Sequence, residues 1–357
     1  MSAFEDFYRD KRVLVTGHTG FKGGWLVTWL TMLGARVTGF ALPPNTRPNL
    51  FDAAMLDRNL QSVFGDLRDR AALTAVFTQH QPEIVFHNAA QPLVRRSYRE
   101  PVETFAINVM GTVHVLEEAR YARSLHAMIV VTSDKCYEDS ESSRGYREDD
   151  AMGGHDPYSS SKGCAELATA AYRRSFYNQH GSAGVATARA GNVIGGGDWS
   201  EDRLVPDIVR GITEEQTIVI RRPDAVRPWQ HVLEPLCGYL LLAKRLWEDR
   251  QGYAEAWNFG PREKDAIPVG ELAKKVTALW GKGALAFQPD PAAPHETQSL
   301  KLNTMKARSR LGWKPALRLE QALEWSVEWY RAYYEQPQSA RNLTEKQIES
   351  YMRISGA

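Results

Sequence analysis

The chain has 357 residues, 43% of them hydrophobic and 24% charged, which is typical of a folded globular protein and, by length, of about two domains. Lysine and arginine (44) almost balance aspartate and glutamate (43), so the net charge of +1 excludes a protein-wide positive field for gripping nucleic acid or an anionic membrane. Three scattered cysteines exclude a disulfide framework. No apolar stretch approaches the ~18 residues of a membrane span. We therefore expect a cytoplasmic protein that is not exported and binds neither nucleic acid nor membrane.

Short β-branched runs alternate with longer helical patterns up to about residue 190, and this alternation is typical of a parallel sheet covered by helices. The predicted strands are 12–16, 35–41, 61–65, 83–87, 126–132 and 184–190. The predicted helices between them are 22–33, 69–80, 101–122 and 157–180. Each crossover is long enough for a right-handed βαβ unit. We therefore predict an α/β fold with a Rossmann-type, doubly wound parallel sheet over residues 1–190.

From Gly191 onward the pattern changes to a glycine-rich turn, proline-punctuated loops and shorter elements. Here the predicted helices are 204–212, 232–248, 268–280 and 319–335, and the predicted strands are 217–220 and 255–259. The last helix has apolar residues at helical spacing, namely Leu319, Ala322, Leu323, Val327 and Tyr330. This spacing favours core packing over a partner interface. We expect a smaller C-terminal α/β region over 191–357, interleaved with the first at its boundary.

A glycine-rich turn follows the first predicted strand. Residues 12–25 read RVLVTGHTGFKGGW, a strand, a G-x-x-G-x-x-G arrangement and the start of a helix. Such glycines let the backbone approach a pyrophosphate, and the N–H groups at the helix N-terminus face its charge. We therefore predict a dinucleotide site here, although the turn alone could be merely tight. Its predicted contacts are Gly17, Thr19, Gly20, Phe21, Lys22 and Gly23.

Three further segments lie where a dinucleotide site predicts partners. Asp66 follows the third strand, where its carboxylate could accept from an adenine amine or cap the helix that begins near Asp69. Residues 88–90 offer small side chains for close contact with ribose and diphosphate. Asn108 is either a structural side chain or a polar anchor for the active-site backbone.

The end of the second strand lacks the acidic residue that commonly binds the ribose 2′-hydroxyl in NAD enzymes. The strand ends Gly39-Phe40-Ala41-Leu42 instead. Arg47 could meet a 2′-phosphate, but its place in a proline-rich loop favours a solvated side chain. This position leaves NAD and NADP both open.

A candidate proton-transfer pair stands in the run Tyr158-Ser159-Ser160-Ser161-Lys162, where the phenol and the ammonium lie one helical turn apart on the same face. A tyrosine has a reference pKa of about 10, so it needs a neighbouring cation to act as a base near neutrality. Lys162 supplies that cation. Ser133, at the end of the strand over 126–132, is a third candidate, and Asp134 and Lys135 follow it directly.

With these motifs the sequence resembles the extended short-chain dehydrogenase/reductase family over nearly its whole length. Thr132-Ser133-Asp134-Lys135 resembles the segment that the family's nucleotide-sugar 4,6-dehydratases use for acid-base chemistry. The phrases GHTGFKGGW, AAQPLVRRSY, SDKCY and GGHDPYSSSKGCAE extend the resemblance and imply CDP-D-glucose as the substrate. The cytosine assignment rests on resemblance and not on a physical readout of the base. The resemblance favours NAD over NADP and implies no metal.

The resemblance implies that Tyr158, ionised beside Lys162 and aligned by Ser133, takes the proton of the glucose C4 hydroxyl during oxidation to a 4-keto sugar. Asp134 would then protonate the departing C6 hydroxyl. Most of these dehydratases have glutamate where this chain has Lys135. Lys135 could be the base at C5, an electrostatic stabiliser of the enolate, or half of a structural Asp–Lys pair. Glu138 is a conceivable substitute base further into the loop.

The resemblance also implies the remaining binding residues. The cofactor contacts outside the glycine turn would be Asp66, Leu67, Asn88, Ala89, Ala90, Asn108, Thr132, Tyr158 and Lys162. The nucleotide-sugar contacts would be Ser133, Asn192, Arg227, Asn258 and His295. Arg227 could instead be a surface residue, Asn258 a cap, and His295 a solvated side chain.

The family commonly pairs long helices, here 101–122 and 157–180, so a homodimer or higher homo-oligomer is expected. Two other functions compete with dehydration. One is a nucleotide-sugar 4-epimerase or dehydrogenase, which would not need Asp134 and Lys135. The other is a non-catalytic dinucleotide-sensing protein, for which the proton-transfer set would have no use.

Overall fold

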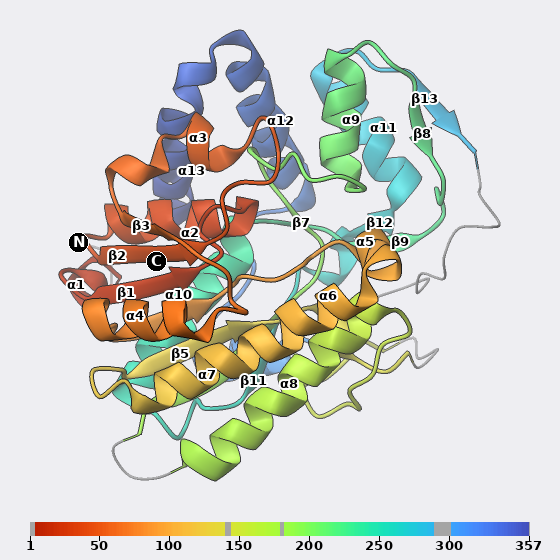
Figure 1. Cartoon of the computed structure of the whole chain (residues 1–357). Coiled ribbons are helices and arrows are strands. Elements are labelled where there is room, and N and C mark those ends of the chain that lie inside the picture. Colours follow the sequence, from red (N-terminus) through yellow and green to blue (C-terminus); the bar gives the residue numbers. More distant parts are fainter. Residues whose placement is uncertain (1–3, 140–143, 179–181, 289–300, 357) are drawn as a thin grey trace.

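A computed structural model describes residues 4–139, 144–178, 182–288 and 301–356. Its centre is a seven-stranded sheet in the order β11-β6-β5-β4-β1-β2-β3, with every neighbouring pair parallel (Figure 1). The strands are β1 (Arg12–Thr16), β2 (Arg36–Ala41), β3 (Gln61–Phe64), β4 (Ile84–His87), β5 (Ala127–Val131), β6 (Gly184–Ala190) and β11 (Ala256–Phe259). The predicted Rossmann-type fold is confirmed. Strand order reverses between β1 and β4, and ligands of such sheets bind at the carboxyl ends beside that point.

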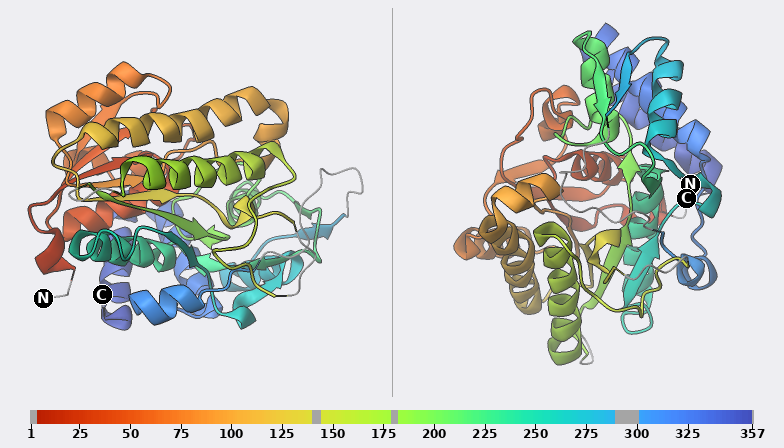
Figure 2. Two further views of the ribbon diagram at one scale, coloured as in Figure 1. Left: turned by 90° about the horizontal axis from the view of Figure 1, so that it is seen from below. Right: turned by 90° about the vertical axis from the view of Figure 1, so that its right-hand side faces the viewer.

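Helices cover both faces of the sheet, as the two views of Figure 2 show. In β1, Leu14 packs toward α4, α7 and α8, whereas Val13 and Val15 pack toward α2 and α10. Because strands of a parallel sheet are buried on both faces, these runs are apolar throughout. The five helices are α2 (Phe21–Met32), α4 (Arg70–His80), α7 (Gly111–Tyr121), α8 (Pro157–Phe176) and α10 (Leu233–Glu248).

The predicted helix over 101–122 is present as three consecutive helical segments. It consists of α6 (Pro101–Phe105), a π-helical turn η2 (Ala106–Met110) and α7. The short elements of the first half are α1 (Glu5–Tyr8), α3 (Leu50–Ala53), η1 (Leu56–Arg58), α5 (Val94–Arg99) and η3 (Asp134–Cys136). The turn η3 holds the candidate acid-base segment at the carboxyl end of β5.

The second half adds three two-stranded sheets and a further group of helices (Figure 1). The sheets pair β10 (Gln230–His231) with β7 (Val193–Ile194), β12 (Ala266–Pro268) with β9 (Val226–Pro228), and β13 (Leu285–Phe287) with β8 (Ile218–Ile220). The helical elements are α9 (Leu204–Thr213), η4 (Glu263–Asp265), α11 (Val269–Trp280), η5 (Ala307–Leu311), α12 (Leu319–Glu335), η6 (Pro337–Ser339) and α13 (Ala340–Ser355).

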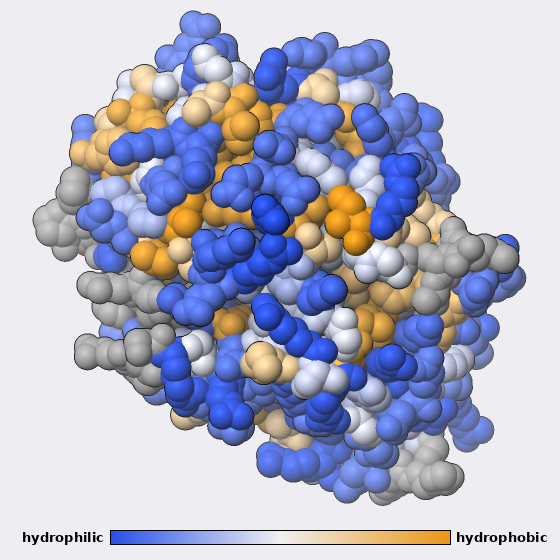
Figure 3. Space-filling view, turned by 180° about the vertical axis from the view of Figure 1, so that it is seen from behind, coloured by the Kyte–Doolittle hydropathy of each residue, from blue (hydrophilic) through white to orange (hydrophobic). Residues whose placement is uncertain are grey.

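The five apolar residues predicted to pack inward from α12 are all buried, which confirms that expectation. Helix α13, which the sequence did not predict, packs Tyr351 against Trp29 of α2 with ring centroids 5.6 Å apart. Seen from behind, the molecule is mainly hydrophilic, with hydrophobic side chains gathered chiefly in the upper half (Figure 3). No helix in the described part of the chain is long and apolar enough to cross a membrane.

Candidate active site

The turn between β1 and α2 forms a cradle with no room for side chains at two of its glycines. Gly17 has a φ of +78°, and a Cβ atom there would lie 2.8 Å from the backbone of Ala89. A Cβ atom on Gly23 would overlap the Gly17 carbonyl oxygen. The N-cap of α2 is Gly20, which has no side chain to satisfy the first N–H groups of the helix. The residues present therefore fit the close approach of a dinucleotide pyrophosphate.

A histidine that the sequence reasoning did not use fills the space beside the end of β2. The ring of His18 lies where a Cβ atom on Gly39 would be, and its Nε2 atom is 2.7 Å from Ser62 Oγ. Burial lowers the pKa of His18 to about 4, so the ring is neutral at neutral pH. The motif GHTG marked this position, but only the fold shows that its ring reaches β3.

The predicted adenine contact, Asp66, already has a partner. Its carboxylate pairs with Arg68 at 2.6 Å, which lowers the pKa of Asp66 chiefly through that hydrogen bond. The cap of α4 is Asp69, whose carboxylate accepts from Ala72 N at 3.0 Å, so Asp66 is not the cap. Arg47 is exposed.

Two predicted cofactor contacts turn their side chains into the protein. Asn108 is 1% exposed, and its amide accepts from Gln91 N at 2.8 Å and donates to Ser161 Oγ at 2.9 Å. It therefore anchors the loop after β4 to α8, which agrees with a polar anchor for the backbone of this region. The Thr132 hydroxyl donates to Glu166 at 2.5 Å. The polar groups of both side chains therefore have partners inside the protein, as buried polar groups require.

Asn258, predicted to contact the substrate, is also engaged inside the protein. It is fully buried, its side-chain oxygen accepts from the Tyr137 hydroxyl at 2.6 Å, and its amide donates to the Tyr146 carbonyl at 2.9 Å. Both ends of its amide thus have partners inside the protein, and the substrate contact stays a prediction. His295 lies outside the described residues, and Asn192 is half-buried beside Gly191.

Ser133, Tyr158 and Lys162 come together at the carboxyl end of β5. Burial raises the pKa of Tyr158 to about 12, against a hydrogen bond with Ser133 and the charge of Arg203. Lys162 donates to the Val131 carbonyl at 3.4 Å, and burial lowers its pKa to about 8. In this structure burial outweighs the nearby cations, so the pKa of Tyr158 is not lowered toward neutrality as the sequence reasoning expected.

Asp134 has the environment of a carboxylic acid. It is 3% exposed, Ser133 Oγ lies 3.0 Å from its Oδ1 atom, and Oδ2 has no hydrogen-bond partner among the described residues. A Cβ atom on Gly191 would lie 2.9 Å from Oδ2, so the glycine makes room for the carboxyl group. Burial raises the pKa of Asp134 despite the charges of Lys135, Arg227 and Lys22. The protonated form is thereby favoured, as a general acid requires.

Cationic side chains outnumber carboxylates around this acid. They are Lys22, Lys135, Lys162, Arg203 and Arg227. Burial, followed by the charges of Arg203 and Lys162, lowers the pKa of Lys22 to about 7. The glycine motif placed Lys22 only at the cofactor, and no motif marked Arg203, whose loop position is set by the second half of the chain. This excess of positive charge suits a ligand with two phosphates.

Glu138, the conceivable substitute base, is exposed in the loop after η3. Lys135 is half-buried, and its backbone N–H donates to Ser133 Oγ at 3.2 Å. Among the described residues, no group of three His, Cys, Asp or Glu side chains could hold a metal ion.

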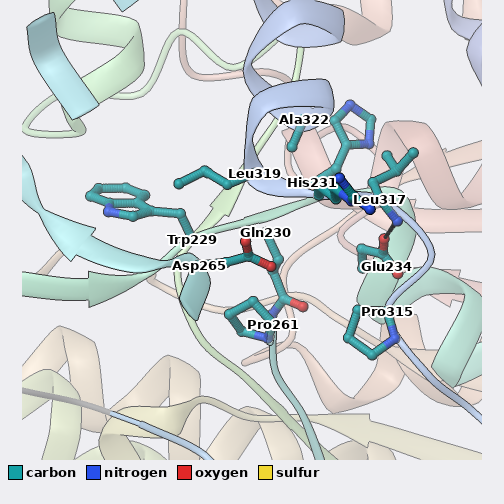
Figure 4. Close-up of a pocket in the computed structure, with 11 residues that line it drawn as sticks. Trp229, Gln230, His231, Glu234, Pro261, Asp265, Pro315, Leu317, Leu319 and Ala322 are labelled. Atoms are coloured by element: carbon teal, nitrogen blue, oxygen red, sulfur yellow. Dashed lines mark hydrogen bonds between the residues drawn. The ribbon is translucent and has the colours of Figure 1, made fainter. Parts of the chain in front are cut away.

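A small pocket lies between β10, η4 and the start of α12 (Figure 4). It is lined by Trp229, Gln230, His231, Glu234, Pro261, Asp265, Pro315, Leu317, Arg318, Leu319 and Ala322. The Gln230 Oε1 and His231 Nε2 atoms have no hydrogen-bond partner in the described structure. None of the catalytic candidates lines this pocket, so it is separate from the proton-transfer site.

We expect Lys162→Met to stabilise the fold at neutral pH, by about 3 kcal/mol, because burial lowers the lysine pKa from 10.5 to about 8. Below about pH 8 the lysine is protonated in the folded and unfolded chains, and folding carries the full cost of burying its charge. Above 10.5 it is neutral in both, so the cost disappears. Denaturant unfolding of both proteins at neutral pH and near pH 10 tests this, and an equal difference at both pH values would contradict it.

Comparison with known proteins gives consistent results. The family model described as GDP-mannose 4,6 dehydratase matches residues 14–325. A CDP-glucose 4,6-dehydratase from Salmonella typhimurium is 48% identical over 353 residues, which cover 98% of each chain. A dTDP-glucose 4,6-dehydratase from Xanthomonas campestris pv. campestris is 28% identical, with 89% of this chain and 92% of the relative covered. The solved structure of MoeE5 in complex with UDP-glucose and NAD is similar with a TM-score of 0.75 and 25% identity, covering 90% of this chain and 99% of that one.

Proposed function

The chain belongs to the nucleotide-sugar 4,6-dehydratases of the extended short-chain dehydrogenase/reductase family, and from this we propose that it converts CDP-D-glucose to CDP-4-keto-6-deoxy-D-glucose with NAD as cofactor. One observation carries the proposal. Asp134, a buried carboxyl group with a raised pKa, lies beside Ser133 at the end of β5. A 4-epimerase or a simple dehydrogenase has no step that needs this acid.

The glycine cradle over 17–23 would hold the cofactor diphosphate, as its free helix N-terminus allows. When bound, NAD supplies the hydride acceptor for oxidation at C4 and the hydride donor for reduction at C6. Tyr158 accepts the proton of the C4 hydroxyl, with Ser133 orienting that hydroxyl and the phenol. Arg203 and the hydrogen bond with Ser133 favour the ionised phenol, and Lys162 adds a second cation one helical turn away on α8.

The 4-keto group makes the C5 hydrogen acidic, and elimination then requires an acid at C6 and a base at C5. Asp134 donates its proton to the C6 hydroxyl, which leaves as water. We assign the base to Lys135, the neighbour of Asp134 on η3. Glu138 is a poorer candidate because it is exposed to solvent.

Lys135→Ala tests this assignment, and we expect roughly 10²–10⁴-fold slower water elimination. The substitution removes a half-buried side chain and leaves the backbone bond from its N–H to Ser133 Oγ in place, so folding and NAD binding should be retained. Exchange of the C5 hydrogen with solvent deuterium reports on the base directly. Normal exchange and normal dehydration in Lys135→Ala would show that another group removes the proton.

The decisive experiment incubates the purified protein with NAD and CDP-, dTDP-, GDP- or UDP-glucose and follows product mass. We expect loss of one water with CDP-glucose. A product of unchanged mass would indicate an epimerase, and unaltered sugar beside bound cofactor would indicate a sensor. Dehydration of another nucleotide sugar in preference would retain the reaction and overturn only the nucleobase.

We further propose that a second copy of the chain covers the outer face of α6, α7 and α8. Figures 1 and 2 show these helices side by side over the sheet. Val102 is 82% exposed, Met110 48% and Leu167 57%, a density of exposed apolar side chains that favours an interface.

The three cysteines are unpaired, which supports a reducing compartment such as the cytoplasm.

For this dimer we expect Leu167→Glu to yield a monomer at concentrations where the unaltered chain is dimeric. A buried, unpaired carboxylate would be costly in an interface but costs little on an exposed helix. Light scattering after gel filtration gives the mass of each species. Val219→Glu, at a 45% exposed site on β8, is the matched control and should leave the mass unchanged. A monomeric unaltered chain would refute the interface.

A further inference from the structure

A buried carboxylate on α8 accepts a hydrogen bond from the residue that directly precedes Ser133. Glu166 is 3% exposed and lies one helical turn beyond Lys162, on the same face of the helix. It accepts from the Thr132 hydroxyl at 2.5 Å, and Thr132 immediately precedes Ser133. It also accepts from the Thr187 hydroxyl on β6 at 2.7 Å. One side chain therefore links the catalytic helix to β5 and β6.

The same carboxylate reaches the far end of the catalytic segment through Arg189. The Arg189 guanidinium pairs with Glu166 at 2.8 Å and donates to the Tyr137 hydroxyl at 2.7 Å. Its guanidinium carbon also lies 4.8 Å from the centre of the Tyr137 ring. Tyr137 follows the turn η3, which contains Asp134 and Lys135. Both ends of the segment 132–137 are thus tied to the helix that carries Tyr158 and Lys162.

We propose that Glu166 is a positioning residue, which fixes the spacing between the acid-base segment 132–137, directly after β5, and the proton-transfer pair on α8. This inference rests on the proposed dehydration. The reaction needs Tyr158 at C4 and the residues of η3 at C5 and C6 of the same sugar. If the distance between Tyr158 and η3 changed, a sugar bound correctly against one of them would be misplaced against the other. The sequence resemblance assigns no role to Glu166.

The charges of Glu166 and Arg189 favour a fixed geometry of the contacts between α8 and the segment 132–137. Burial disfavours the Glu166 carboxylate, but the charge of Arg189 and three hydrogen bonds outweigh burial and lower the pKa of Glu166. A buried ion pair favours the geometry in which its partners meet, since a shift leaves a charge without a partner. Arg189 has a further bond to the Glu148 carbonyl at 3.2 Å, which holds the guanidinium in place.

Two substitutions loosen the segment at its ends without removing either charge. Thr132→Val deletes one hydroxyl bond to Glu166, and Tyr137→Phe deletes the bonds of its hydroxyl with Arg189 and Asn258. We expect each to lower kcat for dehydration by roughly 10- to 100-fold while the KM for the nucleotide sugar stays unchanged. Thr187→Val is the matched control, because it also deletes a hydroxyl bond to Glu166 but lies on β6, outside the segment.

The measurements are kcat, KM and the unfolding midpoint of each variant. A lowered kcat in both segment variants but not in Thr187→Val supports the proposal, even if all three lose similar stability. An equal fall of kcat in all three variants, or no fall in the segment variants, would overturn it. If the unaltered chain dehydrates no nucleotide sugar, the proposed function itself fails, and the outcome is distinct because no variant is needed to see it.

Discussion

Asp134→Asn should fold and bind NAD normally while losing water elimination by roughly 10²–10⁴-fold. Asparagine has nearly the same shape and keeps an oxygen for the contact with Ser133, so the space that Gly191 leaves is filled as before. An amide, however, cannot donate a proton and recover it at neutral pH. The measurement is release of a product one water lighter, compared with NAD affinity and the unfolding midpoint of the same preparation.

The stability of this variant serves as its control. Because burial raises the pKa of Asp134 in the folded chain, the folded state binds the proton more tightly, and its stability falls as pH rises from the unfolded value of 3.8 through the folded pKa. Asparagine lacks this loss, so Asp134→Asn should be at least as stable as the unaltered chain at neutral pH. A fully active Asp134→Asn would remove the acid from the mechanism.

Gly23→Ala should abolish cofactor binding and destabilise the fold, by roughly 1–3 kcal/mol or more. The new Cβ atom would overlap the carbonyl oxygen of Gly17, and neither backbone can move without opening the turn between β1 and α2. Thermal unfolding with and without NAD measures both effects. The unaltered chain should gain stability with added NAD, and the variant should not.

Gly20→Ala distinguishes an effect on NAD binding from an effect on the stability of the glycine turn. Its Cβ atom would meet only the Gly17 carbonyl oxygen, at an ordinary 3.5 Å, so the fold should keep its unfolding midpoint. Any loss of NAD affinity in Gly20→Ala then reports on the approach of the ligand to the helix N-terminus. If Gly23→Ala bound NAD as tightly as the unaltered chain, the cofactor would have to lie elsewhere.

The sheet was predictable because burial on two faces makes each parallel strand an uninterrupted apolar run. The limits 12–16 and 184–190 were predicted without error, as β1 and β6 show. The glycine turn and the Tyr158–Lys162 pair were predictable for a related reason, since spacing along one strand-turn-helix or one helix fixes their geometry.

The remaining features depend on contacts between distant segments. Glu166 and Arg189 form a buried ion pair across α8 and β6, and no local pattern marks two charges as partners. Asn258 had the position of a substrate contact by resemblance, yet the loop around Tyr137 and Tyr146 uses its amide. The pKa of Tyr158 depends on its burial, which only the packed structure reveals.

The sheet cannot be completed during synthesis until its edge strand, β11, has been made. It pairs Trp257 with Ala188 of β6, and until residues 256–259 leave the ribosome β6 presents an unpaired edge. The sheet therefore remains open at this edge while residues 191–255 are made. An expressed fragment that stops near residue 190 would keep this open edge permanently, and aggregation is its expected fate.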